Sequence, residues 1–162
     1  MKHTIIVELF EEHEAVNYYT IRFQGAKESE VEDFLTQFDT EENEDDINII
    51  LAAIDKIGEI GAKENRFRPE GGRLKAIPLT TSKLRLYLYH LSEEVVLIGN
   101  GGLKNTRTFQ ESPELNKKVS ILREVGNKLM SSIKNNNTQL YKRKLTGNLK
   151  FYINTTENEK ES

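Results

Sequence analysis

Two kinds of hydrophobic pattern run along the chain, and the helical one marks three segments. Apolar residues recur at helical spacing after Asn43, which is a predicted N-cap followed by three acidic residues: Ile47, Ile50, Leu51, Ile54, Ile57 and Ile60. Ser112 and Pro113 predict the start of another helix, because Ser caps helices and Pro suits the first position. Its apolar positions are Leu115, Val119, Leu122, Val125, Leu129 and Ile133. Residues 29–38 predict a short third helix.

The other pattern alternates with a period of two and predicts strands. A strand pair is expected from Thr4 to Phe10 and from Tyr18 to Phe23. Three further strands are expected at residues 73–79, 83–91 and 94–99, and the short turns between them favour an antiparallel meander. Residues 139–154 predict a last hairpin that turns at Thr146-Gly147-Asn148.

These elements predict an α+β fold, an antiparallel sheet with helices packed on one face, an N-terminal strand pair and a C-terminal extension. No internal repeat or linker divides the chain. We therefore expect one domain over residues 1–154 and a disordered tail over residues 155–162, which are polar and charged.

Composition excludes several classes of site. The 162 residues contain no Cys, which excludes disulfides, thiol catalysis and iron–sulfur clusters. The three His residues, His3, His13 and His90, are too scattered along the sequence to predict a metal site. The longest apolar stretch, residues 49–54, is too short for a membrane span, and the N-terminus lacks the features of a secretory signal. We expect a cytoplasmic protein without metal, cofactor or membrane partner.

The net charge of −3 conceals an asymmetry. Residues 1–62 carry 4 Lys or Arg against 16 Asp or Glu, whereas residues 63–156 carry 18 against 7. The basic part favours a polyanion such as RNA, DNA or a phosphate-rich ligand. The alternative is that the acidic part packs beside the basic part.

The middle strand of the predicted meander alternates cleanly between leucines and polar residues. Leu84, Leu86 and Leu88 predict one face, and Arg85, Tyr87 and Tyr89 the other. Arg73 and Lys75 alternate in the same way on the preceding strand, so both strands could present cations to one surface. Such a surface is typical of single-stranded nucleic-acid binding. The alternative is a half-buried sheet whose outer face is simply polar. His90 falls with the leucines and is interpreted as a core residue.

Residues 99–107 follow the most apolar strand and contain three glycines among their first four positions. Glycines there indicate positive φ angles or a closely approached backbone, and free N–H groups could bind an anion beside Lys104 and Arg107. The spacing of a phosphate-binding Walker loop is absent. A simple tight turn explains the glycines equally well.

Residues 68–125 resemble the RelE/HigB toxins of bacterial type II toxin–antitoxin systems, members of the RelE/ParE superfamily. The resemblance rests on a long helix leading into GGRLKAIPL, then SKLRLYLYHL, VVLIGNGGLKNTRT and a helix that opens with SPEL. It implies helices on one side of a twisted sheet and a basic groove on the other. It also implies metal-independent cleavage of messenger RNA on the ribosome, by attack of a ribose 2′-OH on the adjacent phosphate. The implied partner is a small helix-turn-helix antitoxin that covers the basic face.

The resemblance also implies site residues. Lys75 matches the basic position of the first meander strand, Arg85 the arginine of the next, and Lys104 and Arg107 the basic pair after the last. Tyr87, Lys75 and Lys104 are the candidate general bases. Arg73, Lys83 and Tyr89 are expected to contact the RNA. The acidic first 62 residues and the greater length depart from the family pattern, and no residue is assigned as the general acid.

Two other functions remain open. The same fold could serve a binding protein without catalysis, either a ParE-like inhibitor of gyrase or a partner of a regulator, because fold does not fix function. An RNA-binding module that stacks bases on Tyr87 and Tyr89 is the third possibility.

Overall fold

The computed structural model describes residues 1–79 and 83–155. Its helices are α1 (Glu30–Gln37), α2 (Glu44–Ile60) and α3 (Pro113–Lys134). Its strands are β1 (Lys2–Glu12), β2 (Asn17–Phe23), β3 (Arg68–Pro69), β4 (Leu74–Ala76), β5 (Leu84–His90), β6 (Val95–Leu103), β7 (Thr138–Tyr141), β8 (Lys144–Gly147) and β9 (Lys150–Asn154). The strand pair, the meander strands and all three helices of the sequence analysis are therefore present, with shifted ends.

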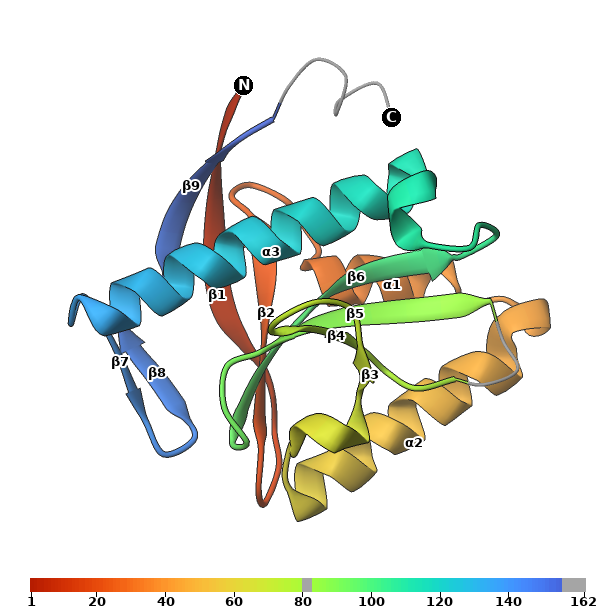
Figure 1. The fold of residues 1–162 in the computed structure, drawn as a ribbon, viewed down its shortest axis with the longest axis horizontal. Helices are drawn as coiled ribbons and strands as arrows, with labels where there is room; N and C mark the ends of the chain where they lie inside the picture. Colours follow the sequence, from red (N-terminus) through yellow and green to blue (C-terminus); the bar gives the residue numbers. More distant parts are fainter. Residues whose placement is uncertain (80–82, 156–162) are drawn as a thin grey trace.

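Seven strands form one sheet in the order β3-β4-β5-β6-β2-β1-β9, and β7 with β8 forms a separate hairpin. The expected meander is confirmed, because β4, β5 and β6 pair antiparallel in sequence order. β2 pairs with β6 in parallel, which corrects the expectation of a purely antiparallel sheet. This pairing joins the N-terminal strand pair to the meander, and α1 and α2 lie in the connection that it requires (Figure 1).

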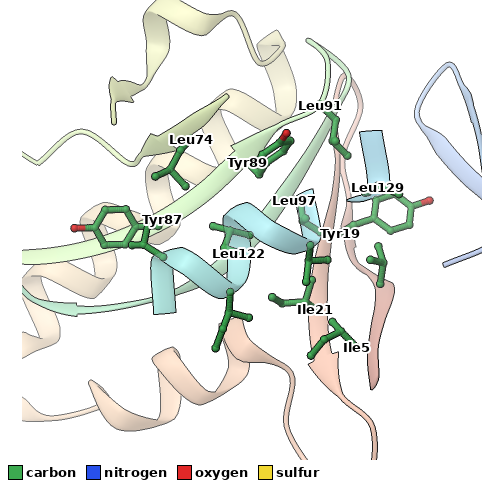
Figure 2. Close-up of a cluster of buried hydrophobic side chains, with 14 of the residues drawn as sticks. Ile5, Tyr19, Ile21, Leu74, Tyr87, Tyr89, Leu91, Leu97, Leu122 and Leu129 are labelled. Atoms are coloured by element: carbon green, nitrogen blue, oxygen red, sulfur yellow. The ribbon is translucent and has the colours of Figure 1, made fainter. Parts of the chain in front are cut away.

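Helices cover both faces of the sheet, so the expectation of helices on a single face is wrong. One buried cluster joins α1 and α2 to the sheet; it includes Phe34 and Ile54 together with Leu84, Leu86 and Leu88 of β5. The other cluster places α3 against the opposite face and is drawn in Figure 2. The physical reason is that both faces of β5 are buried, since aromatic rings follow the leucines in alternation.

The aromatic side of β5 faces α3. Tyr87 and Tyr89 pack there with Leu122 and Leu129 of the helix (Figure 2). The predicted leucine face and the predicted Arg–Tyr face are thus confirmed as opposite faces, but neither is open to solvent over its apolar length. His90 is buried as expected, with Nε2 at 2.6 Å from the carbonyl oxygen of Ala62.

Local signals account for two of the three helix starts. Ser29 caps α1 in a capping box with Glu32, and Ser112 caps α3, which then begins with Pro113. Asn43 precedes α2 as expected, but its side chain makes no capping hydrogen bond. The Asn43 amide instead donates to Thr40 Oγ1 at 2.9 Å.

The C-terminal segment differs from the expected hairpin. The turn lies at Lys142 and Arg143 between β7 and β8, and Lys142 takes a positive φ of 54°. Gly147 ends β8, and β9 then crosses to pair with β1, the register running from Lys2↔Asn154 to Ile6↔Lys150.

The predicted disordered tail falls almost entirely outside the described residues. Thr155, its first residue, is buried, and its N–H donates to the Met1 carbonyl oxygen at 2.9 Å. Residues 156–162 are not described. Among the helices of the described ranges, none is long and apolar enough to cross a membrane.

Candidate functional site

Three cations from the part of the sheet formed by β3 to β6 lie close enough to act electrostatically on one another. They are Arg68 on the edge strand β3, Arg85 on β5 and Lys104 directly after β6. Glu70, just beyond β3, and Tyr87, two residues after Arg85, belong to the same group, because the charges of Glu70, Arg68 and Arg85 act on the Tyr87 hydroxyl. We call these five residues the cation cluster.

Strand register places the cluster on the face that α3 covers. Arg68 pairs with Ala76 across β3 and β4, and Ala76 pairs with Tyr87 across β4 and β5. Residues directly opposite each other in a sheet share a face. The small side chain of Ala76 in the middle of this row leaves room for the larger Arg68 and Tyr87 on either side.

A bulge in β6 shapes the other side of the cluster. The register with β5 shifts between Leu86 and Leu88, and Arg85 pairs with Gly102. A Cβ atom on Gly101 would lie 1.8 Å from the Arg85 carbonyl oxygen, so only glycine fits there. Lys104 follows, with its N–H bonded to the Lys83 carbonyl oxygen at 2.7 Å.

The bulge decides between the alternatives that the glycines left open. Gly99, Gly101 and Gly102 lie within β6, and none of them has a positive φ. A closely approached backbone is therefore the reason for the glycine at 101. Residues 99–102 are strand rather than an anion-binding loop, and the Gly101 N–H is bonded to Asn100 Oδ1 at 2.7 Å.

The electrostatics of the cluster follow from burial and from repulsion between like charges. Burial lowers the pKa of Arg85, and the neighbouring Arg68 lowers it further. Burial likewise lowers the pKa of Lys104, with Arg68 and Arg85 acting in the same direction against Glu70. The three cations outnumber the carboxylates of Glu70 and Glu111 that act on Lys104, so the cluster favours an additional anion.

Apart from its arginines, the cluster has two polar atoms that are buried without a hydrogen bond among the described residues. One is the Tyr87 hydroxyl, which points away from the apolar cluster in Figure 2. Burial raises the pKa of Tyr87 to about 12, and the charge of Glu70 adds to the increase. The other is Glu70 Oε1, which lies 3.6 Å from the Arg68 Nε. Buried polar atoms normally have partners, so this pair is unusual.

Lys75 lies on the opposite face of the sheet from the cluster. Its neighbours Leu74 and Ala76 pack toward α3, and Lys75 itself pairs in register with Leu88. The Lys75 Nζ lies 4.0 Å from Glu64 Oε1. The expectation that Lys75 shares a surface with Arg85 is therefore wrong, because face depends on the register between strands.

Tyr89 and Arg73 make structural contacts instead of forming a binding platform. The Tyr89 ring packs against Gly126 of α3, where a Cβ would lie 2.4 Å from the ring, and its hydroxyl donates to Asn127 Oδ1 at 2.7 Å. Arg73 Nη1 donates to the carbonyl oxygens of His90 and Leu91, each at 3.1 Å. Stacking of bases on Tyr87 and Tyr89 is incompatible with this packing, because both rings are buried.

The remaining expected residues lie at the surface. Arg107 is 90% exposed and pairs with Glu111 of the same turn, its Nε lying 3.8 Å from the carboxylate. Lys83 is exposed at the start of β5. Of the eight residues predicted, the fold brings Arg85, Tyr87 and Lys104 together.

Arg68 and Glu70 complete the cluster and were missed from the sequence. Arg68 lies in the two-residue strand β3 and Glu70 directly after it, whereas the strands predicted from the sequence begin only at residue 73. Because Pro is tolerated on edge strands, the sequence Arg68-Pro69 was compatible with a short edge strand.

We compared the chain with known proteins in three ways. No family model, no curated protein and no solved structure matches it. Its function therefore has to be inferred from the cation cluster itself.

Proposed function

We propose that the cation cluster binds a phosphodiester group of RNA and that the protein cleaves RNA there without a metal ion. The observation that supports the proposal is that Arg68, Arg85 and Lys104 act electrostatically on one another beside Tyr87, whose buried hydroxyl has no hydrogen-bond partner among the described residues. A phosphate oxygen is the ligand that would satisfy both the cations and the hydroxyl.

The roles of the residues follow from their chemistry. Arg85 and Arg68 stabilise the charge that builds on phosphorus as the 2′-oxygen attacks, an effect that typically contributes about 10²–10³ in rate. Lys104, with its lowered pKa, is the residue best suited to accept the 2′-OH proton. Tyr87 stays protonated at neutral pH and donates to a phosphate oxygen.

The bonds in this reaction balance without a co-reactant. The new 2′-O–P bond replaces the 5′-O–P bond, Lys104 takes the 2′-OH proton and the leaving 5′-oxygen takes a proton from water, which leaves a 2′,3′-cyclic phosphate and a 5′-hydroxyl. Lys75 has no role in this scheme, whereas the resemblance implies that Lys75 belongs to the catalytic site. For the substrate and the partner we propose what the resemblance implies. The substrate is messenger RNA on the ribosome, and the partner is a helix-turn-helix antitoxin.

Binding without cleavage is the second candidate function, and one observation favours it. Arg85 is 9% exposed and Tyr87 is fully buried, so an RNA strand first meets Arg68 and Lys104 at the rim. A regulator or inhibitor that binds without cleaving needs only these two accessible cations.

The test uses a 5′-labelled RNA oligonucleotide in EDTA with the full chain and three variants. Arg68→Gln and Lys104→Gln remove cluster charges, and Lys150→Gln removes an exposed charge from β9 at the opposite edge of the same sheet. We expect cyclic-phosphate ends, a loss of about 100-fold in each cluster variant and unchanged cleavage in Lys150→Gln.

Binding is measured on the same oligonucleotide as a function of salt. Each cluster variant should reduce the slope of log affinity against log salt by about 1. Binding with these slopes but without cleavage would favour the second candidate. Equal effects of all three variants, or no binding at all, would reject the cation cluster as an RNA site.

A further inference from the structure

Three ligand-type side chains meet where the turn between β1 and β2 touches α2. One ligand atom each from Glu11, His13 and Asp55 lies within 4.8 Å of the others. None of the three belongs to the cation cluster. We propose that they form a binding site for a divalent transition metal of the zinc class, independent of the proposed RNA site.

The backbone fixes the turn against the helix. The N–H groups of Ala15 and Val16 both donate to the Gly58 carbonyl oxygen, at 2.8 and 3.2 Å. Asp55 lies one turn before Gly58 on α2. These bonds hold the end of β1, which carries Glu11, and the turn, which carries His13, beside the helix that carries Asp55 (Figure 1).

Gly58 provides the space in which the imidazole lies. A Cβ atom at this position would lie 2.4 Å from His13 Cγ and 2.6 Å from Nδ1. Glycine within a helix costs about 1 kcal/mol relative to alanine, and here it allows the ring to rest directly on the helix backbone. The edge of the Tyr18 ring system, with a centroid 5.4 Å from that of His13, fixes the other side.

The ring orientation leaves Nε2 as the ligand atom. Nδ1 faces the helix at Gly58, whereas Nε2 lies 2.9 Å from Glu11 Oε1. The charges of Glu11 and Asp55 both raise the pKa of Tyr18, after the larger effect of burial, so both carboxylates act on the same small region. Glu11 is 42% exposed and Asp55 is exposed, which leaves the metal accessible to water.

The donor set selects among metals. One imidazole nitrogen with two carboxylates suits Zn²⁺ and Co²⁺, whereas Mg²⁺ and Ca²⁺ prefer oxygen ligands alone. Three protein ligands also leave at least one position for water. A metal binds the neutral form of imidazole and the ionised form of carboxylates, so the ligand set carries a charge of −2, which a divalent cation neutralises.

The experiment titrates the full chain with ZnCl₂ by calorimetry. His13→Gln and Asp55→Asn each remove one ligand. His3→Gln and Asp39→Asn make the same chemical changes at a histidine and an exposed aspartate outside the site. We expect one Zn²⁺ per chain, at least a tenfold weaker affinity in the two site variants and affinities within twofold of the parent in the controls.

Co²⁺ absorption gives an independent measure of the ligands. Visible bands should appear with one equivalent of Co²⁺ and be lost in His13→Gln, while thermal melting without metal verifies that this variant is folded. Absence of stoichiometric binding, equal loss in the control variants or displacement of Zn²⁺ by an equal concentration of Mg²⁺ would each overturn the proposal.

Discussion

Replacing Tyr87 with phenylalanine should make the protein more stable, because its hydroxyl is buried without a hydrogen bond among the described residues. A buried polar group without a partner costs about 1–3 kcal/mol. The Tyr87 ring stabilises the folded state through its packing on the side of the sheet that α3 covers. These contacts include an edge-on contact with Phe109 at 5.8 Å between centroids, and phenylalanine keeps them. We expect the free energy of unfolding to rise by about 1–2 kcal/mol.

Tyr89 provides the matched control, since it lies two residues away on the same strand and the same face. Its hydroxyl donates to Asn127 Oδ1 at 2.7 Å. Tyr89→Phe loses this bond and should lower the free energy of unfolding by about 0.5–1.5 kcal/mol. The same removal of one oxygen atom is therefore expected to have opposite signs at the two positions.

The assay is urea unfolding of the parent and both variants at neutral pH, followed by circular dichroism. For a domain of this size, 1 kcal/mol shifts the melting temperature by about 2–4 °C, so thermal melting gives a second measure. A Tyr87→Phe variant that is less stable than the parent would refute the reasoning, because it would mean that the hydroxyl has a partner. If the hydroxyl serves RNA, the stabilised variant should also bind the oligonucleotide more weakly.

Two further predictions concern the sheet and a helix end. Gly101→Ala should destabilise the protein by about 1–3 kcal/mol in urea unfolding, because the new methyl group meets the Arg85 carbonyl oxygen; unchanged stability would mean that the bulge is absent. Hydrogen bonds between Ser29 and Glu32 hold the pKa of the Glu32 carboxyl below its ordinary value. The ionised carboxylate therefore stabilises the folded state at pH values above the ordinary pKa, and this contribution is lost as the pH falls through the lowered pKa. Glu32→Gln should therefore be less stable than the parent at pH 7 and equally stable at pH 2, and a difference that persists at pH 2 would contradict the assignment.

The elements that the sequence predicted well depend on short-range pattern. The alternation of Leu84, Leu86 and Leu88 identified one buried face of β5, and the cap at Ser112 located the start of α3. Each of these signals is contained within a few residues of the chain. They therefore do not depend on the tertiary structure around them.

The errors concern relations between distant segments or short elements. The face of Lys75 depends on the register of β4 against β5, which no local pattern specifies. The parallel pairing of β2 with β6 joins residues 17–20 to residues 95–98. The true C-terminal turn has Lys142 at positive φ, where glycine or asparagine is the usual signal, whereas Thr146-Gly147-Asn148 carried that signal without forming the turn.

The candidate site shows the same division. Arg85, Tyr87 and Lys104 were identified from their strand positions, but Arg68 and Glu70 reach them only through the two-residue strand β3. A strand of that length is too short to show alternation. The cluster consequently combines residues that pattern can reveal with residues that only the register brings into place.

The pairing of β9 with β1 means that one edge of the sheet is completed only at the end of synthesis. The outer edge of the first strand has no neighbour until residues 150–154 have been made, which at 5–20 residues per second takes roughly 7–30 s. During that interval the nascent chain presents an open, partly apolar strand edge, which can pair with other chains. Chaperone-free translation should therefore yield more aggregate from chains truncated before residue 150 than from the full chain.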